Sequence, residues 1–521
     1  MKFETPLNLE LKEDILTNLK NLDSKLTGFS ELLEVKNVEV REEKLGGKLR
    51  FRINIRYRTK VEITPRTIAV AEAFGIGIGE PQEFIVYNNL ELLIGEEDIV
   101  YITGDSGSGK SVLLKAIEKA LGPKAKNIND VEIDREKPLI ETVGATINEG
   151  LELLSRVGLN DAFLFVRKYD ELSDGQKYRY RLAKLIESNA QFWVADEFCS
   201  TLDRDTAKIV AFNAQKLARE LRKGLIVATC NQDLFEDLGP TVYIVKYFGQ
   251  EVKVRYFPSQ PPKECSLVKE MKIVEGTIED YKKLAHFHYR SSHLAAPKKI
   301  FTLKRNDEVV GVVVYARPPF ICFGRAKYFG RALSVKELNE KLLTITRIIV
   351  HPKYRTIGLG VKLLRETLPL AGKPYVEMVA VMARYNPFAE KAGMIKIAEK
   401  EPDKKLLKFQ EYLESLGFNR YLLSSVSYNI SKLRKLSKKQ IENVKKALVE
   451  CHHFFLLKNV LSDDEYRLKD EEKKWKICAR KIKKIRIERL AKLLSIVARL
   501  LQVKVYLIWK REVKSNSTVR E

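Results

Sequence analysis

The sequence predicts an α/β protein with two consecutive domains and a basic, mainly helical C-terminal region. Two segments, at residues 97–121 and 343–368, follow the order strand, glycine-containing loop, helix. In residues 477–501 apolar side chains recur with helical spacing, and lysines and arginines fill most positions between them. With 521 residues, of which 45% are hydrophobic, the chain can form more than one core.

Basic residues outnumber acidic ones, with 93 Lys and Arg against 69 Asp and Glu and a formal net charge of +24. Such a surplus indicates a polyanionic partner, either nucleic acid or an anionic membrane surface. No apolar stretch is long enough to cross a bilayer, because Arg499 and Lys504 interrupt the best candidate. The N-terminus does not resemble a signal peptide and the six cysteines form no C-x-x-C pair, so we expect a cytoplasmic protein with free thiols.

The N-terminal region, residues 1–65, contains a strongly alternating segment that predicts a strand with one apolar face. Arginines occupy most positions of the opposite face. One interpretation is an ordinary half-buried strand with a solvated face. The other is contact with phosphate groups, because solvated faces usually also carry Glu and Lys. The nucleic-acid-binding candidates here are Arg50, Arg52, Arg56 and Arg58.

A phosphate-binding motif lies between the first predicted strand and its helix. Residues 104–111 read GDSGSGKS and match G-x-x-x-x-G-K-[ST], in which glycines let backbone N–H groups close on phosphates. Lys110 would contact the β- and γ-phosphates of ATP, and Ser111 would hold Mg²⁺. The predicted ATP-binding residues of this loop are Gly104, Asp105, Ser106, Gly107, Ser108, Gly109, Lys110 and Ser111.

Three further motifs follow in the predicted ATPase domain, residues 66–256. Residues 172–176 read LSDGQ, residues 192–197 read FWVADE and residues 200–203 read STLD. Together they resemble the signature, Walker B and D-loop motifs of the ABC superfamily. The resemblance implies that Asp196 organises Mg²⁺, that Glu197 polarises the attacking water, and that two subunits sandwich ATP as a homodimer. It also implies ATP contacts by Ser173, Gly175, Gln176 and Asp203.

Departures from the ABC pattern concern the response to the γ-phosphate. Cys230 and Asn231 stand where the family has its switch histidine, and Asp174 replaces the first glycine of the signature. No Q-loop glutamine is recognisable between the phosphate loop and the signature. These departures favour slow, switch-like hydrolysis over rapid motor cycling.

A second anion-binding motif follows the proline-rich linker at residues 258–262. Residues 351–360 read HPKYRTIGLG between a strand and an amphipathic helix, and residues 386–394 read NPFAEKAGM. Both motifs resemble those of the GNAT acyltransferases, over a domain that we place at residues 263–403. The resemblance implies acetyl-CoA binding at the helix start by Ile349, Val350, Arg355, Thr356, Ile357, Gly358, Leu359, Gly360, Asn386 and Phe388.

The residues that would carry acyl transfer are marked less clearly. Ala389 stands where many GNAT enzymes have a tyrosine that protonates the CoA thiolate, so either Tyr385 or a water takes this role, or the fold only binds CoA. Residues 286–293 contain three histidines and are interpreted as a metal site, as structural histidines, or as the source of a general base. With Arg347, this segment resembles the Mom-type GNAT branch, which modifies adenine. The catalytic candidates are His288, Tyr289, Tyr385 and Arg347.

The C-terminal region, residues 404–521, predicts basic helices. A solvated face is the default for charges on a helix, but a dense block of one sign suits a nucleic-acid backbone. The candidates in this block are Arg480, Lys481 and Lys484.

The whole layout resembles an archaeal family in which an ABC-type ATPase is fused to a GNAT domain. We therefore expect an ATP-dependent acetyl-CoA acyltransferase that modifies a base amine of a nucleic acid, with tRNA or another structured RNA favoured over DNA. Two alternatives stay open: an ATP-regulated protein N-acetyltransferase, and a non-catalytic ATP switch that assembles on RNA or the ribosome. The expected cofactors are ATP, Mg²⁺ and acetyl-CoA, and the expected partners are nucleic acid and a second copy of the chain, without a membrane.

Overall fold

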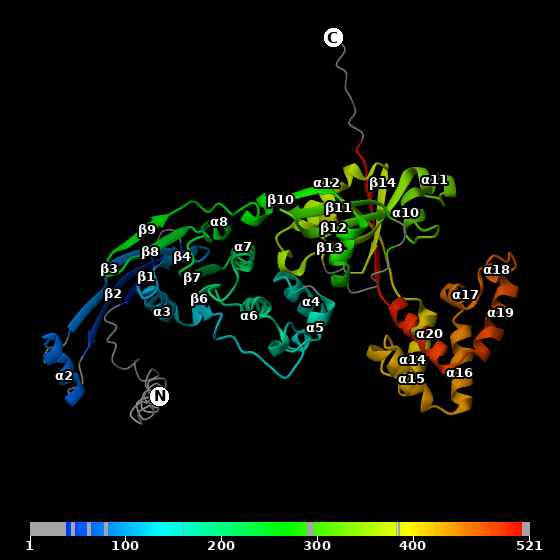
Figure 1. Ribbon diagram of the computed structural model, residues 1–521, viewed down its shortest axis with the longest axis horizontal. Coiled ribbons are helices and arrows are strands. Elements are labelled where there is room, and N and C mark those ends of the chain that lie inside the picture. The colour runs from blue at the N-terminus through cyan, green and yellow to red at the C-terminus, as the bar shows by residue number, and fades with distance from the viewer. Residues whose placement is uncertain are drawn as a thin grey trace, which may run out of the picture.

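The computed structural model describes residues 38–42, 47–59, 64–77, 82–159, 161–288, 294, 297–381, 383 and 386–512. Two α/β parts lie next to each other, and a separate group of helices follows the second part (Figure 1). Ile15, Leu19, Leu22 and Leu26 recur with helical spacing in the sequence, and this predicted helix lies outside the described ranges.

A six-stranded sheet forms the centre of the first part, in the order β5-β6-β7-β4-β8-β9. The strands are parallel except β9, which is antiparallel to β8. Its strand β4 is buried along its whole length, as expected for an apolar run in a parallel sheet covered on both faces. The strands are β4 (Ile99–Gly104), β5 (Ala125–Asn127), β6 (Phe192–Ala195), β7 (Gly224–Ala228), β8 (Val242–Lys246) and β9 (Val252–Tyr256).

Helices pack on this sheet, and a second, three-stranded sheet extends it. Strands β1 (Val38–Glu42), β2 (Lys48–Thr59) and β3 (Gln82–Gly95) are antiparallel, and β2 and β3 share one apolar core with β4 and α3. The arginine-rich strand therefore belongs to the first part. The helices are α2 (Pro65–Phe74), α3 (Lys110–Leu121), α4 (Ile147–Arg156), α5 (Ala162–Phe165), α6 (Asp174–Glu187), α7 (Arg204–Glu220) and α8 (Phe235–Leu238).

The second part contains a seven-stranded sheet in the order β10-β11-β12-β13-β14-β16-β15. Its strands are β10 (Met271–Glu275), β11 (Pro297–Arg305), β12 (Glu308–Ala316), β13 (Leu342–Val350), β14 (Tyr375–Ala380), β15 (Ile395–Lys400) and β16 (Lys504–Lys510). The strand predicted within residues 343–368 is found as β13, and β11 and β12 form an antiparallel hairpin. Its helices are α9 (Ile278–Leu284), α10 (Arg325–Phe329), α11 (Val335–Lys341), α12 (Leu359–Thr367) and α13 (Phe388–Lys391).

Strand β16 comes from the C-terminal region and lies between β14 and β15, pairing with both in antiparallel orientation. The helices of that region are thus inserted between two neighbouring strands of the second sheet, an arrangement that the sequence did not suggest. They have their own apolar core, built around Leu413, Leu448 and Leu494. They are α14 (Lys404–Ser415), α15 (Val426–Arg434), α16 (Lys438–Glu450), α17 (Phe454–Val460), α18 (Asp463–Tyr466), α19 (Glu471–Lys484) and α20 (Ile487–Leu500).

Strands β13 and β14 pair over only part of their length. Their parallel register runs from Leu342 opposite Tyr375 to Ile345 opposite Met378 and then stops. The rest of β13, from Thr346 to Val350, lines a cavity instead. Because backbone groups that leave a ladder need other partners, this end of the sheet is suited to hold an extended ligand.

The two α/β parts share apolar contacts. Ile209 and Phe212 of α7 are buried in the same core cluster as Leu267, Leu363 and other residues of the second part. Helix α7 therefore packs on both the first sheet and the second part, and the two parts form one continuous body (Figure 1). None of the helices in the described ranges is long and apolar enough to cross a membrane.

Candidate functional site

The phosphate loop joins β4 to α3 and is shaped by glycines. Gly107 has φ 76° and nothing within 4 Å of an added Cβ, so a side chain there would project into the open cradle. At Gly104, with φ 142°, an added Cβ would lie 1.9 Å from the carbonyl oxygen of Lys246, so only glycine fits. The Lys110 ammonium donates to the Asp105 carbonyl at 2.6 Å, and the buried Ser108 hydroxyl has no hydrogen-bond partner. The loop fits a ligand rich in phosphate oxygens.

A pair of hard oxygen ligands lies beside this loop. The Ser111 hydroxyl donates to Asp196 Oδ1 at 2.8 Å, and Asp196 follows the buried strand β6. A hydroxyl and a carboxylate at the phosphate loop are ligands that suit Mg²⁺. Glu197 is exposed next to Asp196 and has a left-handed backbone, with φ 47°. Its carboxylate is free of the core and can approach a ligand.

The signature and the D-loop begin two helices. Ser173 caps α6, where its N–H donates to Gln176 Oε1 at 3.0 Å, and Gly175 adjoins Thr206 of α7. Asp203 caps α7 and accepts from the Thr206 N–H at 3.2 Å. Ser173 and Asp203 are both exposed.

Asn231 occupies the position of the missing switch histidine. Its side-chain oxygen accepts from Arg204 Nη1 at 2.8 Å, and its carbonyl accepts from the Tyr101 hydroxyl. A carboxamide side chain, unlike imidazole, does not titrate near neutral pH. The site therefore lacks a pH-sensitive contact at this position.

A cavity of about 640 Å³ lies at the point where β13 and β14 separate. Gly358 has φ 86° with open space where a Cβ would lie, and an added Cβ at Gly360 would lie 3.6 Å from the Phe388 ring. The first N–H groups of α12 have no partner within the helix, so the loop fits an anion. Of the residues predicted for acetyl-CoA, those that line the cavity are Ile349, Val350, Arg355, Thr356, Gly358, Leu359, Gly360, Asn386 and Phe388. The side chain of Ile357 instead packs in the core.

Two of the catalytic candidates also line this cavity. His288, at the end of the segment that follows α9, is half-buried there, and Arg347 of β13 donates to the Thr346 carbonyl at 2.7 Å. Tyr289 and Tyr385 lie outside the described residues. Ala389 is buried, so it offers no group for proton transfer. Within the described ranges, no cluster of three His, Cys, Asp or Glu side chains could hold a metal ion.

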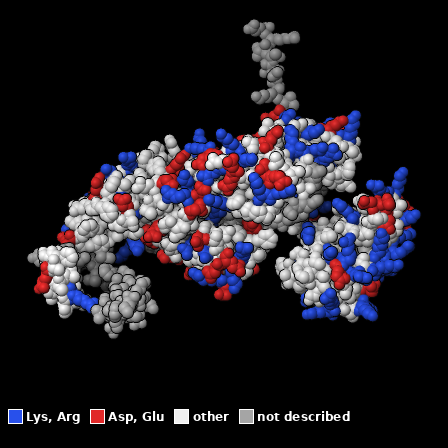
Figure 2. Space-filling view, in the orientation of Figure 1, with Lys and Arg blue, Asp and Glu red and all other residues white. Residues whose placement is uncertain are grey.

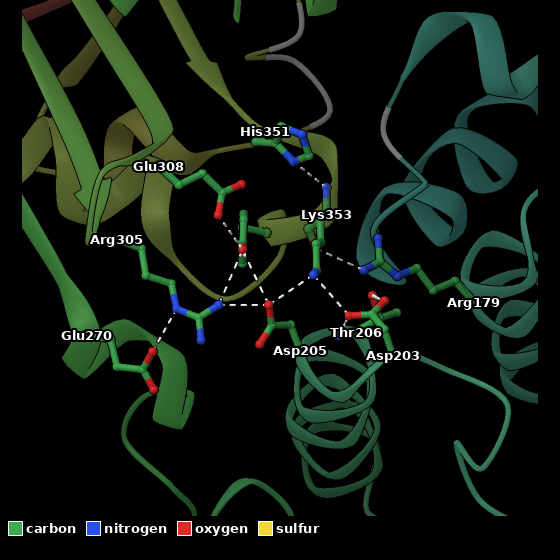
Figure 3. A network of polar contacts seen from close by, with 10 residues as sticks. Arg179, Asp203, Asp205, Thr206, Glu270, Arg305, Glu308, His351 and Lys353 are labelled. Carbon is green, nitrogen blue, oxygen red and sulfur yellow. Dashed lines mark hydrogen bonds and ion pairs between the residues drawn. The ribbon is translucent and has the colours of Figure 1, made fainter. Parts of the chain in front are cut away.

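An ion-pair network connects the D-loop helix to the loop that precedes α12 (Figure 3). The Lys353 ammonium lies 3.0 Å from Asp203 Oδ1 and 2.9 Å from Asp205 Oδ2. Asp205 also pairs with Arg305 Nη1 at 2.7 Å, and Arg305 pairs with Glu270 at 2.7 Å. We call Asp203, Asp205, Arg305 and Lys353 the interdomain clamp.

The same loop is held by other residues of the first part. Arg179 of α6 donates to the Lys353 carbonyl at 3.3 Å, and burial, with repulsion from Arg355, lowers the pKa of Arg179 to about 10. Asn213 of α7 hydrogen-bonds Thr356, which has a left-handed φ of 79°. A Cβ at Gly158 would lie 2.9 Å from the Thr356 methyl group. Thr356 is thus kept in an unfavourable backbone conformation by contacts from the neighbouring part.

The clamp should keep its charges across the neutral pH range. Although burial opposes it, hydrogen bonds from Thr206 and Lys353 lower the pKa of Asp203, and contacts with Arg305 and Lys353 do the same for Asp205. Burial lowers the pKa of Lys353, but its two carboxylate partners, Asp203 and Asp205, raise this pKa above its usual value. A carboxyl pKa that is lowered by folding stabilises the folded state above about pH 4. A lysine pKa that is raised by folding stabilises the folded state below about pH 10. Between these limits the clamp is fully charged.

The arginine face of β2 meets carboxylates on the neighbouring strand. Glu91 of β3 lies 2.9 Å from Arg52 and 3.4 Å from Arg50, and Glu83 lies 3.5 Å from Arg56. Arg52 lowers the pKa of Glu91 through its hydrogen bond and its charge. The side chain of Arg58 lies outside the described residues. The sequence suggested that these arginines lack compensating charge. That prediction is wrong for Arg50, Arg52 and Arg56, because Glu83 and Glu91 of the neighbouring strand β3 pair with them.

The helical insertion carries dense basic patches on the face shown in Figure 2. Arg480 and Lys484 of α19 are exposed, whereas Lys481 is ion-paired with Glu465. Two of the three candidates in this block are thus available to an anionic partner.

Sequence reasoning missed several residues around the cavity. Asn213, Lys216 and Glu220 of α7, with Ser155 and Arg156 of α4, form its wall on the side of the first part. Nothing in the sequence marks them, since they occupy ordinary positions of amphipathic helices and reach the cavity only through packing of the two parts.

Comparison with known proteins finds two matching families. Residues 87–200 match the ABC transporter family, and residues 266–392 match the Acetyltransferase (GNAT) family. Methionine import ATP-binding protein MetN of Clostridium tetani is 27% identical over 191 residues, which cover 29% of this chain and 59% of that protein. The alpha-hemolysin translocation ATP-binding protein HlyB of Escherichia coli O157:H7 is 25% identical over 181 residues, covering 28% of this chain and 25% of that protein. The chain thus spans about three fifths or less of these two relatives.

Among solved structures, the dimeric post-hydrolysis ATP-binding cassette MJ0796 bound to ADP and Pi is 20% identical, with a TM-score of 0.29. It covers 35% of this chain, and 95% of its own length is matched. The two family matches show that the chain contains an ABC-type ATPase domain and a GNAT acetyltransferase domain. Both domains indicate enzymatic activity.

Proposed function

We propose that this protein is an ATP-dependent acyltransferase that moves an acetyl group from acetyl-CoA to a base amine of a nucleic acid, most simply tRNA or another structured RNA. The observation that carries the proposal is the interdomain clamp, in which Asp203 of the D-loop and Lys353 beside the pyrophosphate loop share an ion pair of 3.0 Å. Through this contact, events at the ATP site reach the acyl-CoA loop.

The proposed ATP cycle uses two copies of the chain. The exposed Ser173 and the half-buried Gly175 and Gln176 of one copy would complete the ATP site formed by Lys110 and neighbouring residues of the other. Mg²⁺, held by Ser111 and Asp196, would neutralise phosphate charge. The D-loop lies at such a junction, so dimer closure would displace Asp203 and the Lys353 bound to it.

The proposed transfer takes place in the cavity between β13 and β14. The acceptor amine attacks the thioester carbonyl, the new N–C bond forms, and the C–S bond breaks to release CoA. His288 accepts the proton that the amine loses, because imidazole titrates near neutral pH. The departing thiolate takes a proton from solvent or from a residue of the cavity wall.

A nucleic-acid acceptor is supported by charge. The net charge of +24 and the exposed basic side chains of the helical insertion would attract a polyanion in what we infer to be a cytosolic protein (Figure 2). The likeness of the segment around His288 to Mom-type enzymes favours a base amine. A basic protein acceptor would be repelled by the same charge.

Mass spectrometry tests the acceptor directly. We expect nucleosides from cells that lack the gene to be missing one acetylated nucleoside, which returns when the purified protein, acetyl-CoA and ATP are added to their RNA. A complete set of nucleosides, together with the loss of an acetylated protein, would instead show a protein acetyltransferase. No change in either class would indicate an ATP switch without transfer.

Replacing Lys353 by methionine should uncouple the two sites. We expect the stimulation of transfer by ATP to fall about 5–150-fold, which is the usual range of a coupling free energy, with the basal rate retained. Transfer would be measured with and without ATP, with Lys341→Met as control, since Lys341 pairs only locally with Glu337. Full ATP stimulation in the Lys353 variant would show that the clamp does not transmit the signal.

A further inference from the structure

The ATPase domain forms one wall of the acyl-CoA cavity. Helix α4 contributes Arg156, and α7 contributes Asn213, Lys216 and Glu220. These α7 residues are three or four positions apart, so they share one face of the helix. Without the ATPase domain, the cavity would be open on this side.

Basic side chains from both domains meet at this wall. Lys391, at the end of α13, also lines the cavity and is close enough to Lys216 to lower its pKa. Desolvation by the surrounding protein is the larger cause of that lowered pKa, repulsion from Arg156 adds to it, and Glu220 opposes it. Arg156 is compensated by Glu220, which lies 3.0 Å away. In the described ranges, neither the Lys216 nor the Lys391 ammonium has a hydrogen bond or ion pair.

Contacts of α12 and α7 place these two lysines relative to the pyrophosphate loop. Arg365, near the end of α12, donates to the Lys391 carbonyl at 2.8 Å. The loop that would hold the diphosphate lies at the opposite end of this helix, around Gly358. Lys391 therefore lies towards the C-terminal end of α12, and Lys216 lies one helical turn beyond Asn213, which hydrogen-bonds Thr356 of this loop.

We propose that Lys216 and Lys391 bind the 3′-phosphate of coenzyme A, so that the ATPase domain completes the binding site for the acyl donor. The inference rests on the proposed use of acetyl-CoA. Coenzyme A carries its 3′-phosphate on the ribose, apart from the diphosphate, so a pair of lysines in the same cavity as the diphosphate cradle suits this second phosphate. A phosphate monoester carries between one and two negative charges at neutral pH, and lysine binds it as a point charge.

The affinities of the full-length protein for CoA and for 3′-dephospho-CoA test this site. They would be measured by calorimetry on the wild type, Lys216→Met, Lys391→Met and the control Lys208→Met, which lies on α7 outside the cavity. We expect each cavity variant to bind CoA about 10-fold more weakly, the usual size of one charge-assisted contact. Binding of 3′-dephospho-CoA should stay within about twofold of the wild type, and the control should match the wild type.

Each result has a separate meaning. Equal losses for both ligands would place the lysines at the diphosphate and overturn the proposal, as would unchanged binding of CoA in both variants. If the wild type bound neither ligand, the proposed acyltransferase function would itself fail. Because the variants change different domains, loss of folding in one, detected by thermal unfolding, leaves the other as the test.

Discussion

A protein in which Glu197 is replaced by glutamine should bind ATP normally but hydrolyse it about 10²–10⁴-fold more slowly, the usual contribution of a general base. Glutamine keeps the shape of the side chain but cannot accept a proton. Glu197 is suited to this role because it is exposed directly after Asp196, whose carboxylate lies 2.8 Å from the Ser111 hydroxyl. Phosphate release would measure hydrolysis, and equilibrium binding of a fluorescent ATP analogue would measure affinity.

The same variant tests the proposed dimer. If two copies sandwich ATP, slow hydrolysis should make the dimer accumulate with ATP, as light scattering after size-exclusion chromatography would detect. Acyl transfer should persist in this state if closure alone activates the acyl-CoA site. The control is Glu97→Gln, which neutralises another exposed carboxylate of the same domain. Normal hydrolysis by Glu197→Gln would show that a different group activates the water.

The local motifs of this protein could be predicted because each is contiguous in the sequence. The loop from Gly104 to Ser111 and the loop from Arg355 to Gly360 both lie between a strand and a helix, as the sequence predicted. Glycines are needed there for positive φ and for space, which is a property of the local backbone. Motifs of this kind are visible without knowledge of the tertiary structure.

Contacts between distant segments could not be predicted in this way. Strand β16 joins the second sheet more than a hundred residues after β15, and no local pattern shows which strand it will pair with. The acids opposite the arginines of β2 follow from the register between β2 and β3. Likewise, Asn213 and Lys216 reach the cavity because Ile209 and Phe212 of the same helix are buried in the core of the second part. These contacts between the domains thus depend on packing of distant segments.

Replacing Arg325 by methionine should lower the free energy of unfolding of the acetyltransferase domain by about 3–5 kcal/mol, because it leaves a buried carboxylate without its counter-charge. Arg325 Nη2 lies 2.6 Å from Glu377 Oε1, and Glu377 of β14 is fully buried. The Tyr506 hydroxyl of β16 donates to the other carboxylate oxygen at 2.9 Å. Through Tyr506, the buried carboxylate of Glu377 therefore connects β14, the strand beside the cavity, to the C-terminal strand β16. Denaturant titration of the full chain, followed by a probe in this domain, would measure the loss.

Removal of both charges separates the ion pair from simple packing. The double variant Arg325→Met with Glu377→Leu should be more stable than Arg325→Met alone, because no unpaired charge stays buried. Tyr506→Phe removes a single hydrogen bond and should cost less than Arg325→Met, about 1.5–3 kcal/mol for a bond to a charged group. If the double variant were less stable than the single one, the carboxylate would be shown to be tolerated without Arg325, and Tyr506 would then be the contact that keeps β16 beside β14. Because β14 forms one side of the cavity, its attachment to β16 also determines how far that side can move when a ligand enters.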